Sequence, residues 1–292
     1  MLLLNQHVHR LIDLALEEDI GPGDITTQTT IDPEVMAEAH IRAKQELIVA
    51  GIPVAGAVFA HLDAEVIFAP RVDDGEQVKP GTVLAEVVGP AALLLLGERV
   101  ALNFLMRLSG IATWTRGFVD AVQPHKAWIV DTRKTTPGWR VLEKYAVRLG
   151  GGANHRFGLF DGILIKDNHI KVAGGIGAAV RLARQGAPHT LKIEVEVSDL
   201  AGLEEAIAAG ADIVLLDNMP ETTLARAVQT AAGRVLLEAS GGMSLERVGR
   251  VAATGVDLIS VGALTHSAPA VDIHMKIIRA AVLEPEPMPT SA

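Results

Sequence analysis

The sequence predicts an α/β protein in which a β-rich α+β N-terminal domain precedes a barrel of parallel strands. Apolar, strand-like runs follow residue 125, at 127–131, 162–166, 192–197, 212–217, 234–239 and 258–262. Ala-rich helical stretches separate most of these runs, and such alternation is typical of βαβ units with parallel strands. No G-x-G-x-x-G follows the first run, so the pattern favours a barrel over a dinucleotide-binding sheet.

The segment before the barrel mixes a helix with short strands. Apolar residues between 11 and 18 stand at helical spacing, and the Gly-Pro-Gly sequence at 21–23 ends this predicted helix. A loop or strand is expected after Asp24. Between residues 37 and 88, short β-branched runs interrupted by Gly or Asp-Gly predict a β-rich, sandwich-like module.

We therefore expect three segments along the chain. Residues 1–114 form the N-terminal helix and the β-rich domain, which ends in a strongly apolar helix at 93–109. The catalytic α/β barrel occupies 115–270. Residues 271–292 form a C-terminal helix that returns to the N-terminal domain, followed by a Pro-rich tail from 284 onward that is expected to be disordered.

Composition narrows the classes of function. The chain has 292 residues, 49% of them hydrophobic, and a net charge of -9, which opposes nucleic acid and anionic membranes. Its longest uninterrupted apolar stretch, 91–96, is far below the ~20 residues of a membrane span. Zero cysteines exclude disulfides, thiolate nucleophiles and Cys-ligated metals, and no secretory signal is visible, so we expect a cytoplasmic enzyme.

The first strand of the predicted barrel runs directly into a cluster of polar residues. The sequence from Asp131 to Pro137 reads DTRKTTP. Arg133 and Lys134 suit a substrate with several negative charges, and Thr132 adds a hydroxyl donor for carboxylate or phosphate oxygens. A solvated strand end is the structural alternative for this segment taken alone.

The other predicted strands also end in polar residues. Lys166 ends the second strand, Glu194 and Glu196 lie in the third, and Asp217 ends the fourth. In α/β barrels the catalytic groups come from the carboxyl ends of the strands. The period of two in Lys192 to Val197 places both glutamates on the interior face, where buried carboxylates need cations or a metal as partners. A structural ion pair would explain Glu194 equally well, whereas Glu196 is the better site candidate.

Small residues follow the last two strands, as Ser240, Gly241 and Gly242 and as Val261, Gly262 and Ala263. Backbone N–H groups approach a phosphate closely where side chains are small, and barrels commonly bind phosphate in these loops. Tight turns without a ligand are the alternative.

The glycine run at 150–152 precedes His155 and Arg156, which suggests a loop that brings a cation to the ligand. A metal site at His155 and His169 is a weaker alternative, because their spacing does not fix two ligands on one face.

Lys79 lies in a turn like those of lipoyl or biotinyl carriers. No mirrored half of the β module carries a matching lysine, so the carrier alternative is weak.

The order of these motifs resembles one family, quinolinate phosphoribosyltransferase, also called carboxylating nicotinate-nucleotide pyrophosphorylase. The matching segments are EDIGPGDIT (18–26), GERVALNFLMRLSGIAT (97–113), DTRKTTPG (131–138), KYAVRLGGGANHRFGL (144–159), LIKDNHI (164–170), EVEV (194–197), LLDN (215–218), EASGG (238–242) and ISVGALTHSAP (259–269). The resemblance implies an incomplete α/β barrel of the type II phosphoribosyltransferase kind and a homodimer that can assemble further. It also implies that quinolinate and phosphoribosyl pyrophosphate give nicotinate mononucleotide, pyrophosphate and CO2 in NAD biosynthesis.

The resemblance further implies roles for individual residues. The anion pocket would consist of Arg133, Lys134, His155, Arg156 and Lys166, with Thr132 beside it. Glu196 and Asp217 would hold ribose hydroxyls and Mg2+, and the 240–242 and 261–263 loops would hold the 5-phosphate. Arg99 would enter the partner subunit's site, and Lys134, Lys166, Glu196 and Asp217 are the expected catalytic residues. A related group of proteins from molybdenum transport operons is the alternative within this fold, although it resembles the chain less at 18–24 and 150–156.

Overall fold

The computed structural model describes residues 4–282 and divides into two compact units. The first contains the chain up to Thr113 together with the part from Pro269 onward, and the second is Trp114–Ala268. The boundary between 113 and 114 falls inside a single helix, α4 (Ala91–Ala121). No helix in the described part of the chain is long and apolar enough to cross a membrane. The tail expected from 284 onward lies outside the described residues.

The first unit is built on a four-stranded antiparallel sheet in the order β12-β1-β5-β3. Its strands are β1 (Val35–Ala43), β3 (Ile67–Pro70), β5 (Val83–Pro90) and β12 (Ile273–Val282). Alternate residues of β1, including Ala39 and Ile41, are buried, which is the period expected of a strand with one covered face. A second, two-stranded sheet pairs β2 (Leu47–Ile48) with β4 (Gln77–Val78).

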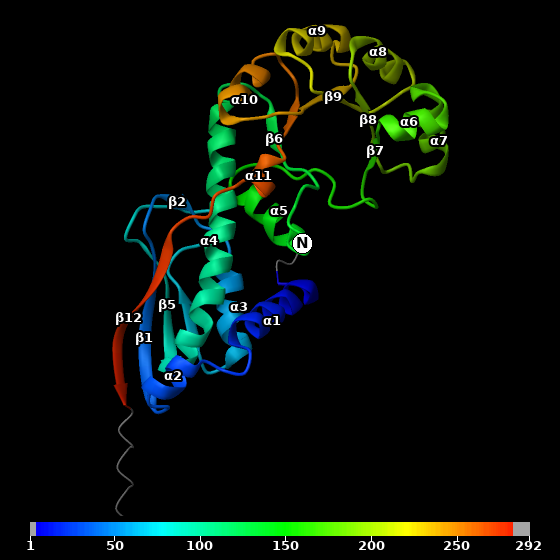
Figure 1. Ribbon diagram of the computed structural model, residues 1–292. Coiled ribbons are helices and arrows are strands. Elements are labelled where there is room, and N and C mark those ends of the chain that lie inside the picture. Colours follow the sequence, from blue (N-terminus) through cyan, green and yellow to red (C-terminus); the bar gives the residue numbers. More distant parts are fainter. Residues whose placement is uncertain (1–3, 283–292) are drawn as a thin grey trace, which may run out of the picture. The chain divides into compact units, whose positions relative to one another are not determined.

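Helices α1 (Gln6–Ile20), α3 (Ile52–Leu62) and α4 lie on one side of this sheet (Figure 1). Helices, rather than a second large sheet, therefore cover the β-rich module. The Phe59 ring on α3 stacks on Phe68 of β3 with centroids 6.0 Å apart, and Gly97 of α4 packs closely against Phe59. The predicted first helix is present, and Gly21 adopts a positive φ of 51° at its end.

Two expectations for the first unit are wrong. The chain after Asp24 forms the helix α2 (Ile25–Thr30), because the Asp24 carboxylate accepts the Thr27 N–H as an N-cap. The C-terminal helix expected from 271 is instead the strand β12, which pairs with β1 from Val35↔Val282 to Ala43↔Ile273. Backbone bonds to a strand more than 200 residues earlier decide this conformation, and the local pattern does not reveal them.

The second unit contains a six-stranded parallel sheet in the order β6-β11-β10-β9-β8-β7. Its strands are β6 (Trp128–Val130), β7 (Ile163–Ile165), β8 (Ile193–Val197), β9 (Ile213–Asp217), β10 (Leu236–Ser240) and β11 (Leu258–Ser260). Each lies within a predicted run or extends one residue beyond it, which confirms the parallel α/β architecture. β6 and β7 form opposite edges, so the barrel is incomplete, with one isolated bridge from Val130 to Ala153 at the β6 edge.

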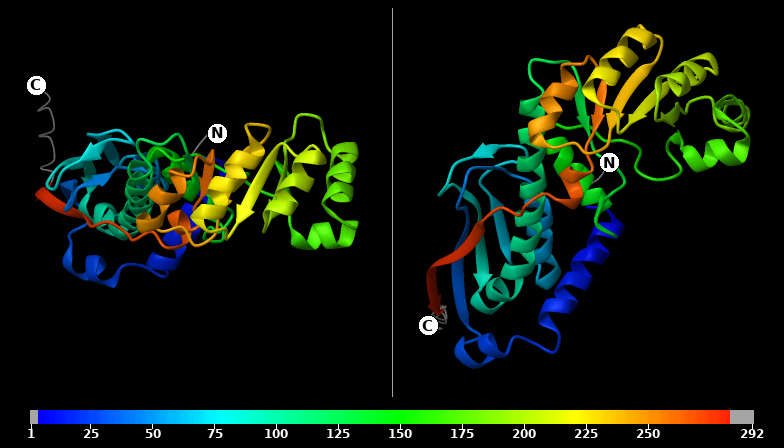
Figure 2. Two further views of the ribbon diagram at one scale, coloured as in Figure 1. Left: turned by 90° about the horizontal axis from the view of Figure 1, so that it is seen from above. Right: turned by 45° about the horizontal axis from the view of Figure 1, so that its top comes forward.

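Helices follow the strands and line the convex side of the curved sheet, as Figure 1 shows for α8, α9 and α10 and as Figure 2 shows from two other directions. The helices of this unit are α5 (Arg140–Leu149), α6 (Asp167–Ala173), α7 (Ile176–Gly186), α8 (Leu200–Ala208), α9 (Glu221–Ala231), α10 (Leu245–Ala252) and α11 (Ala263–His266). Val195 and Leu216 are fully buried, since they point outward from the strands beneath the helices. The opposite, concave face carries the polar strand ends.

Candidate active site

A cavity of about 550 Å³ lies at the carboxyl ends of the parallel strands. It brings together most of the residues predicted for the site: Thr132, Arg133, Lys134, His155, Arg156, Lys166, Glu196, Asp217, Ser240, Gly241 and Gly242. Five further residues, which were not among the predicted site residues, also line the cavity: Leu164, Leu215, Asn218, Glu238 and Ser260. Glu238 and Ser260 alternate with outward-facing residues along their strands, so the same period that placed Glu196 could have placed them.

The remaining predicted residues do not line this cavity. Arg99 is exposed on α4 in the first unit. Val261 is 1% exposed, and its N–H donates to the Val130 carbonyl at 2.9 Å, so neither its side chain nor its N–H is available to a phosphate. Gly262 lies beside the cavity, because a Cβ on it would meet the Lys134 side chain at 3.0 Å. Ala263 begins α11 directly after it.

Asp131 is the buried anchor of the cationic side of the cavity. Its carboxylate forms an ion pair with Lys144 of α5, and the Asn154 amide donates to it at 2.6 Å. The His155 N–H donates to the same carboxylate at 2.9 Å. Burial raises the pKa of Asp131, and Lys144 and these N–H donors oppose that shift. Asp131 thereby fixes the segment that carries His155 against the strand end that carries Arg133.

Arg133 and Arg156 bring like charges to one cavity. Burial, and then the nearby Arg133 guanidinium, lower the pKa of Arg156. Arg156 also donates to the Gly162 carbonyl at 3.0 Å, which holds the guanidinium in place. Two like charges held close together repel each other unless an anion lies between them. This pair therefore suits a ligand with more than one carboxylate.

Lys166 and Glu196 form an ion pair at the ends of β7 and β8. The Lys166 side chain is 46% exposed and the Glu196 side chain 19% exposed, so water still reaches the pair. An ion pair in such a setting contributes little to stability, and its groups remain able to exchange partners with a substrate. The pairing agrees with the expectation that a cation would face the interior glutamates.

A buried cluster of His155, Glu194 and Glu238 lies in the concave face of the sheet. The His155 Nε2 is 3.0 Å from Glu194 Oε2 and 3.8 Å from Glu238 Oε1. The Arg156 N–H donates to His155 Nδ1 at 2.7 Å, which leaves the ring proton on Nε2, where it is donated to Glu194. These ligand-type atoms cluster as they do in metal sites, but an Nε2 that carries a proton is a donor and not a ligand.

Burial and the neighbouring Glu194 raise the pKa of Glu238 to about 7. Glu194 and Glu238 therefore form a buried pair of carboxylates in which Glu238 readily retains a proton. The structural reading of Glu194, as the partner of a neighbouring cation or imidazole, is the one that this geometry supports.

Asp217, Asn218 and Gly241 shape the opposite side of the cavity. Asn218 adopts a positive φ of 54°, donates its N–H to the Ser240 carbonyl and donates its amide to Asp217 Oδ2 at 2.8 Å. A side chain on Gly241, whose φ is 95°, would collide with the Asn218 amide oxygen. Glycine is therefore required at 241 for the two loops to meet, independently of any phosphate.

The donor set of the cavity is compatible with magnesium. Glu196 and Asp217 supply carboxylate oxygens, and Mg2+ in phosphate-transferring sites usually takes one or two carboxylates together with substrate oxygens and water. Asp217 is partly exposed and Glu196 is paired with Lys166, so both have an oxygen available on the cavity side.

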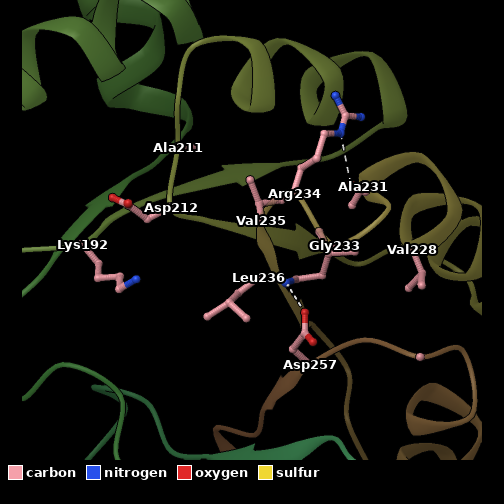
Figure 3. A pocket seen from close by; sticks show the side chains of 12 residues that line it. Lys192, Ala211, Asp212, Val228, Ala231, Gly233, Arg234, Val235, Leu236 and Asp257 are labelled. Carbon is pink, nitrogen blue, oxygen red and sulfur yellow. Dashed lines mark hydrogen bonds between the residues drawn. The ribbon is translucent and has the colours of Figure 1, made fainter.

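A second cavity, of about 490 Å³, lies at the amino ends of the strands (Figure 3). Lys192, Asp212, Arg234 and Asp257 line it, but the two carboxylates hold backbone groups. Asp212 accepts the Ile193 N–H and Asp257 accepts the Leu237 N–H, both at 2.8 Å. Arg234 donates to the Ala231 carbonyl (Figure 3). These charges stabilise strand starts, so we assign the active site to the cavity at the carboxyl ends.

Comparison with known proteins agrees with this assignment. The model of the quinolinate phosphoribosyl transferase N-terminal domain matches residues 24–109, and that of the C-terminal domain matches residues 111–276. The chain is 49% identical to a probable nicotinate-nucleotide pyrophosphorylase [carboxylating] of Bacillus subtilis, over 92% of both proteins.

Solved structures give the same result. NadC from Streptococcus pyogenes is 42% identical, with a TM-score of 0.90 over 95% of this chain and 97% of that one. The nicotinate-nucleotide pyrophosphorylase from Francisella tularensis is also 42% identical, with a TM-score of 0.90 over 93% and 96%. These matches do not favour the molybdenum-operon alternative. With both domain models matched in order and the polar strand ends gathered in one cavity, this chain belongs to the quinolinate phosphoribosyltransferase family.

Proposed function

We propose that this enzyme joins quinolinate to phosphoribosyl pyrophosphate and releases pyrophosphate and CO2, which gives nicotinate mononucleotide for NAD biosynthesis. The main support is the approach of Arg133 and Arg156 within one cavity that also contains Glu196 and Asp217. A pyridine dicarboxylate would place negative charge between the guanidinium groups. The relatives named nicotinate-nucleotide pyrophosphorylase [carboxylating] support the same reaction.

The cavity divides into two sides in this proposal. Arg133, Lys134, Arg156 and Lys166 bind the carboxylates of quinolinate and the pyrophosphate oxygens. His155 donates its Nε2 proton to Glu194 and lines this side of the cavity, a role that differs from the anion binding that the family resemblance implies. The small residues at 240–242 and the Gly262–Ala263 segment receive the 5-phosphate, and Asp217 and Glu196 face the ribose.

Charge development in the reaction fits this division. As pyrophosphate leaves, the ribose acquires positive, oxocarbenium-like character, which the Glu196 and Asp217 carboxylates stabilise directly or through ribose hydroxyls. Lys134 and Lys166 stabilise the departing pyrophosphate. Mg2+ held by Glu196 and Asp217 together with substrate oxygens would neutralise further pyrophosphate charge.

Decarboxylation follows formation of the nitrogen–carbon bond in this scheme. The quaternised ring nitrogen is then positively charged, so it stabilises the electron pair left on the adjacent ring carbon when CO2 departs. That carbon takes up a proton to give nicotinate mononucleotide.

Product formation from quinolinate and from nicotinate, each with phosphoribosyl pyrophosphate and Mg2+, tests the proposal. A much larger kcat/KM for quinolinate is expected, and comparable values for the two acids would refute the dicarboxylate site.

The proposal includes a homodimer in which Arg99 enters the partner's site. Arg99 is exposed on α4, and a further guanidinium would add to the positive charge around the dianion. Arg99→Ala and Lys166→Ala should each be inactive alone. In a mixed dimer one site collects both defects and the other collects neither, so random exchange should restore activity to roughly a quarter of wild type. Mixed dimers that form but stay inactive would place Arg99 in its own chain's site.

A cytoplasmic location is also part of the proposal. Zero cysteines suit a reducing compartment, where disulfides do not contribute to stability. Cell fractionation with an antibody against the chain tests it, and recovery of the protein in a membrane or secreted fraction would overturn it.

A further inference from the structure

Arg140, near the cavity but outside its lining, connects two of the segments that carry site residues. It is the first residue of α5. Its Nε donates to Thr135 Oγ1 at 3.0 Å and its Nη2 to the Arg133 carbonyl at 3.3 Å, both in the 131–136 loop. Its Nη1 donates to the Phe157 carbonyl at 3.0 Å, in the 153–157 segment. One planar guanidinium therefore joins the segment that carries Arg133 to the segment that carries Arg156.

The two segments carry charges that repel each other. Arg133 lies in one and Arg156 in the other, both guanidinium groups line the same cavity, and burial together with the nearby Arg133 charge lowers the pKa of Arg156. Arg140 donates to the carbonyl of Arg133 itself and to the carbonyl of Phe157, the residue that follows Arg156. Arg140 therefore acts on the backbone at the points from which both guanidinium groups project. Lysine has no fork with which to reach two separate carbonyls in fixed directions.

Arg247 makes an equivalent connection on the other side of the cavity. It lies on α10 and donates to the Gly241 carbonyl at 2.7 Å and to the Met219 carbonyl at 2.9 Å. Its Nε is 3.2 Å from the Glu221 carboxylate, which holds the guanidinium against the start of α9. The connected loops are the one that follows Asp217 and the one that contains Gly241 and Gly242.

We propose that Arg140 and Arg247 are positioning residues that each tie two active-site loops together, Arg140 on the dicarboxylate side and Arg247 on the phosphoribosyl side. This inference rests on the proposed function for the assignment of substrates to sides. Neither residue lines the cavity, and each acts through the backbone of residues that do. The hydrogen bonds of each guanidinium fix the spacing between two loops that bind the same ligand. A shift of about 1 Å in such binding groups can lower the rate up to 10²-fold.

Measuring the KM of both substrates in variants of both arginines separates the role of Arg140 from that of Arg247. In Arg140→Gln we expect the KM for quinolinate to rise about 10-fold, with the KM for phosphoribosyl pyrophosphate within about twofold of wild type. Arg247→Gln should show the reverse. Arg140→Lys and Arg247→Lys should shift the same constants in the same direction by a smaller factor, since one ammonium replaces only part of the fork.

Arg184→Gln is the matched control. Arg184 also bridges a carbonyl and a carboxylate, Gly210 O at 2.7 Å and Asp212 Oδ2 at 2.9 Å, but at the amino ends of the strands. It should lower the melting temperature at most and leave both KM values unchanged. If Arg140→Gln does not fold, Thr135→Val and Arg140→Lys replace it, because each removes only part of the connection.

The outcomes are distinct. Equal rises of both KM values in either variant, no KM change despite a lower melting temperature, or an equal KM shift in Arg184→Gln would each overturn the inference. Wild-type enzyme is assayed in parallel. If wild type does not convert quinolinate, the proposed function fails. If it does but the KM values do not separate, only the positioning role fails.

Discussion

The two ends of the parallel strands carry similar residues but use them differently. At the amino ends, Asp212 and Asp257 accept backbone N–H groups of the neighbouring strands. At the carboxyl ends, Glu196 and Asp217 line a cavity together with Arg133 and Lys166. Cavities of similar size, about 490 Å³ and 550 Å³, lie at the two ends. The difference lies in what the charged groups already bind, so cavity size alone does not identify the site.

Asp131, which follows β6, is fully buried at the carboxyl ends but accepts a backbone N–H as the aspartates at the amino ends do, and its loss should have the largest effect. Asp131→Ala leaves the buried Lys144 ammonium and the Asn154 amide without their carboxylate. Breaking such a buried pair usually costs about 3–5 kcal/mol in the free energy of unfolding. Urea unfolding measures this loss. A loss below about 1 kcal/mol would show that the buried ion pair does not anchor the segment.

Lys166→Ala should separate catalysis from stability at the carboxyl ends. The Lys166 side chain is 46% exposed, so its ion pair with Glu196 adds little to stability. Loss of a strong electrostatic contact to substrate should lower kcat/KM by a factor on the order of 10²–10³, with the melting temperature nearly unchanged. A large fall in melting temperature with a modest kinetic change would instead make the pair structural, like those at the amino ends.

Glu238→Gln tests the buried carboxylates through pH. The folded pKa of Glu238 is about 7 against an ordinary 4.5, so the folded state retains a proton that the unfolded state loses. The contribution of Glu238 to the free energy of unfolding is therefore fully present below pH 4.5 and is lost as pH rises through 7. Between pH 5 and 8 the wild type should lose roughly 2–3 kcal/mol relative to Glu238→Gln, from the pKa difference. Parallel pH profiles for the two proteins in urea unfolding would contradict this assignment.

Asp257→Ala should have the smallest effect and complete the comparison. It removes one acceptor, for the Leu237 N–H, at the amino ends. A loss of about 1 kcal/mol in the free energy of unfolding is expected for one hydrogen bond of this kind. Both KM values and kcat should stay at wild-type levels. A rise in the KM of only one substrate would mean that the amino-end cavity affects substrate binding at the carboxyl ends.

The sequence predicted the parts of the molecule that depend on local pattern. All the strands of the second unit appear where apolar runs stood, and Glu196 points inward as its period required. It did not predict β12, because the strand forms only by pairing with distant β1. Nor did it identify the orientation of His155, which depends on the N–H of Arg156 meeting Nδ1. The roles of Arg140 and Arg247 were missed because their partners are backbone carbonyls of other loops.

The pairing of β12 with β1 also orders events during synthesis. β1 lies at residues 35–43 and its outer partner at 273–282, so the ribosome completes the whole second unit before that partner exists. Until then β1 has β5 on one side and presents unpaired backbone groups on the other. Such an open edge can pair with other chains. The nascent protein therefore has an edge that can pair with other chains until β12, the last strand within residues 4–282, is made and covers it.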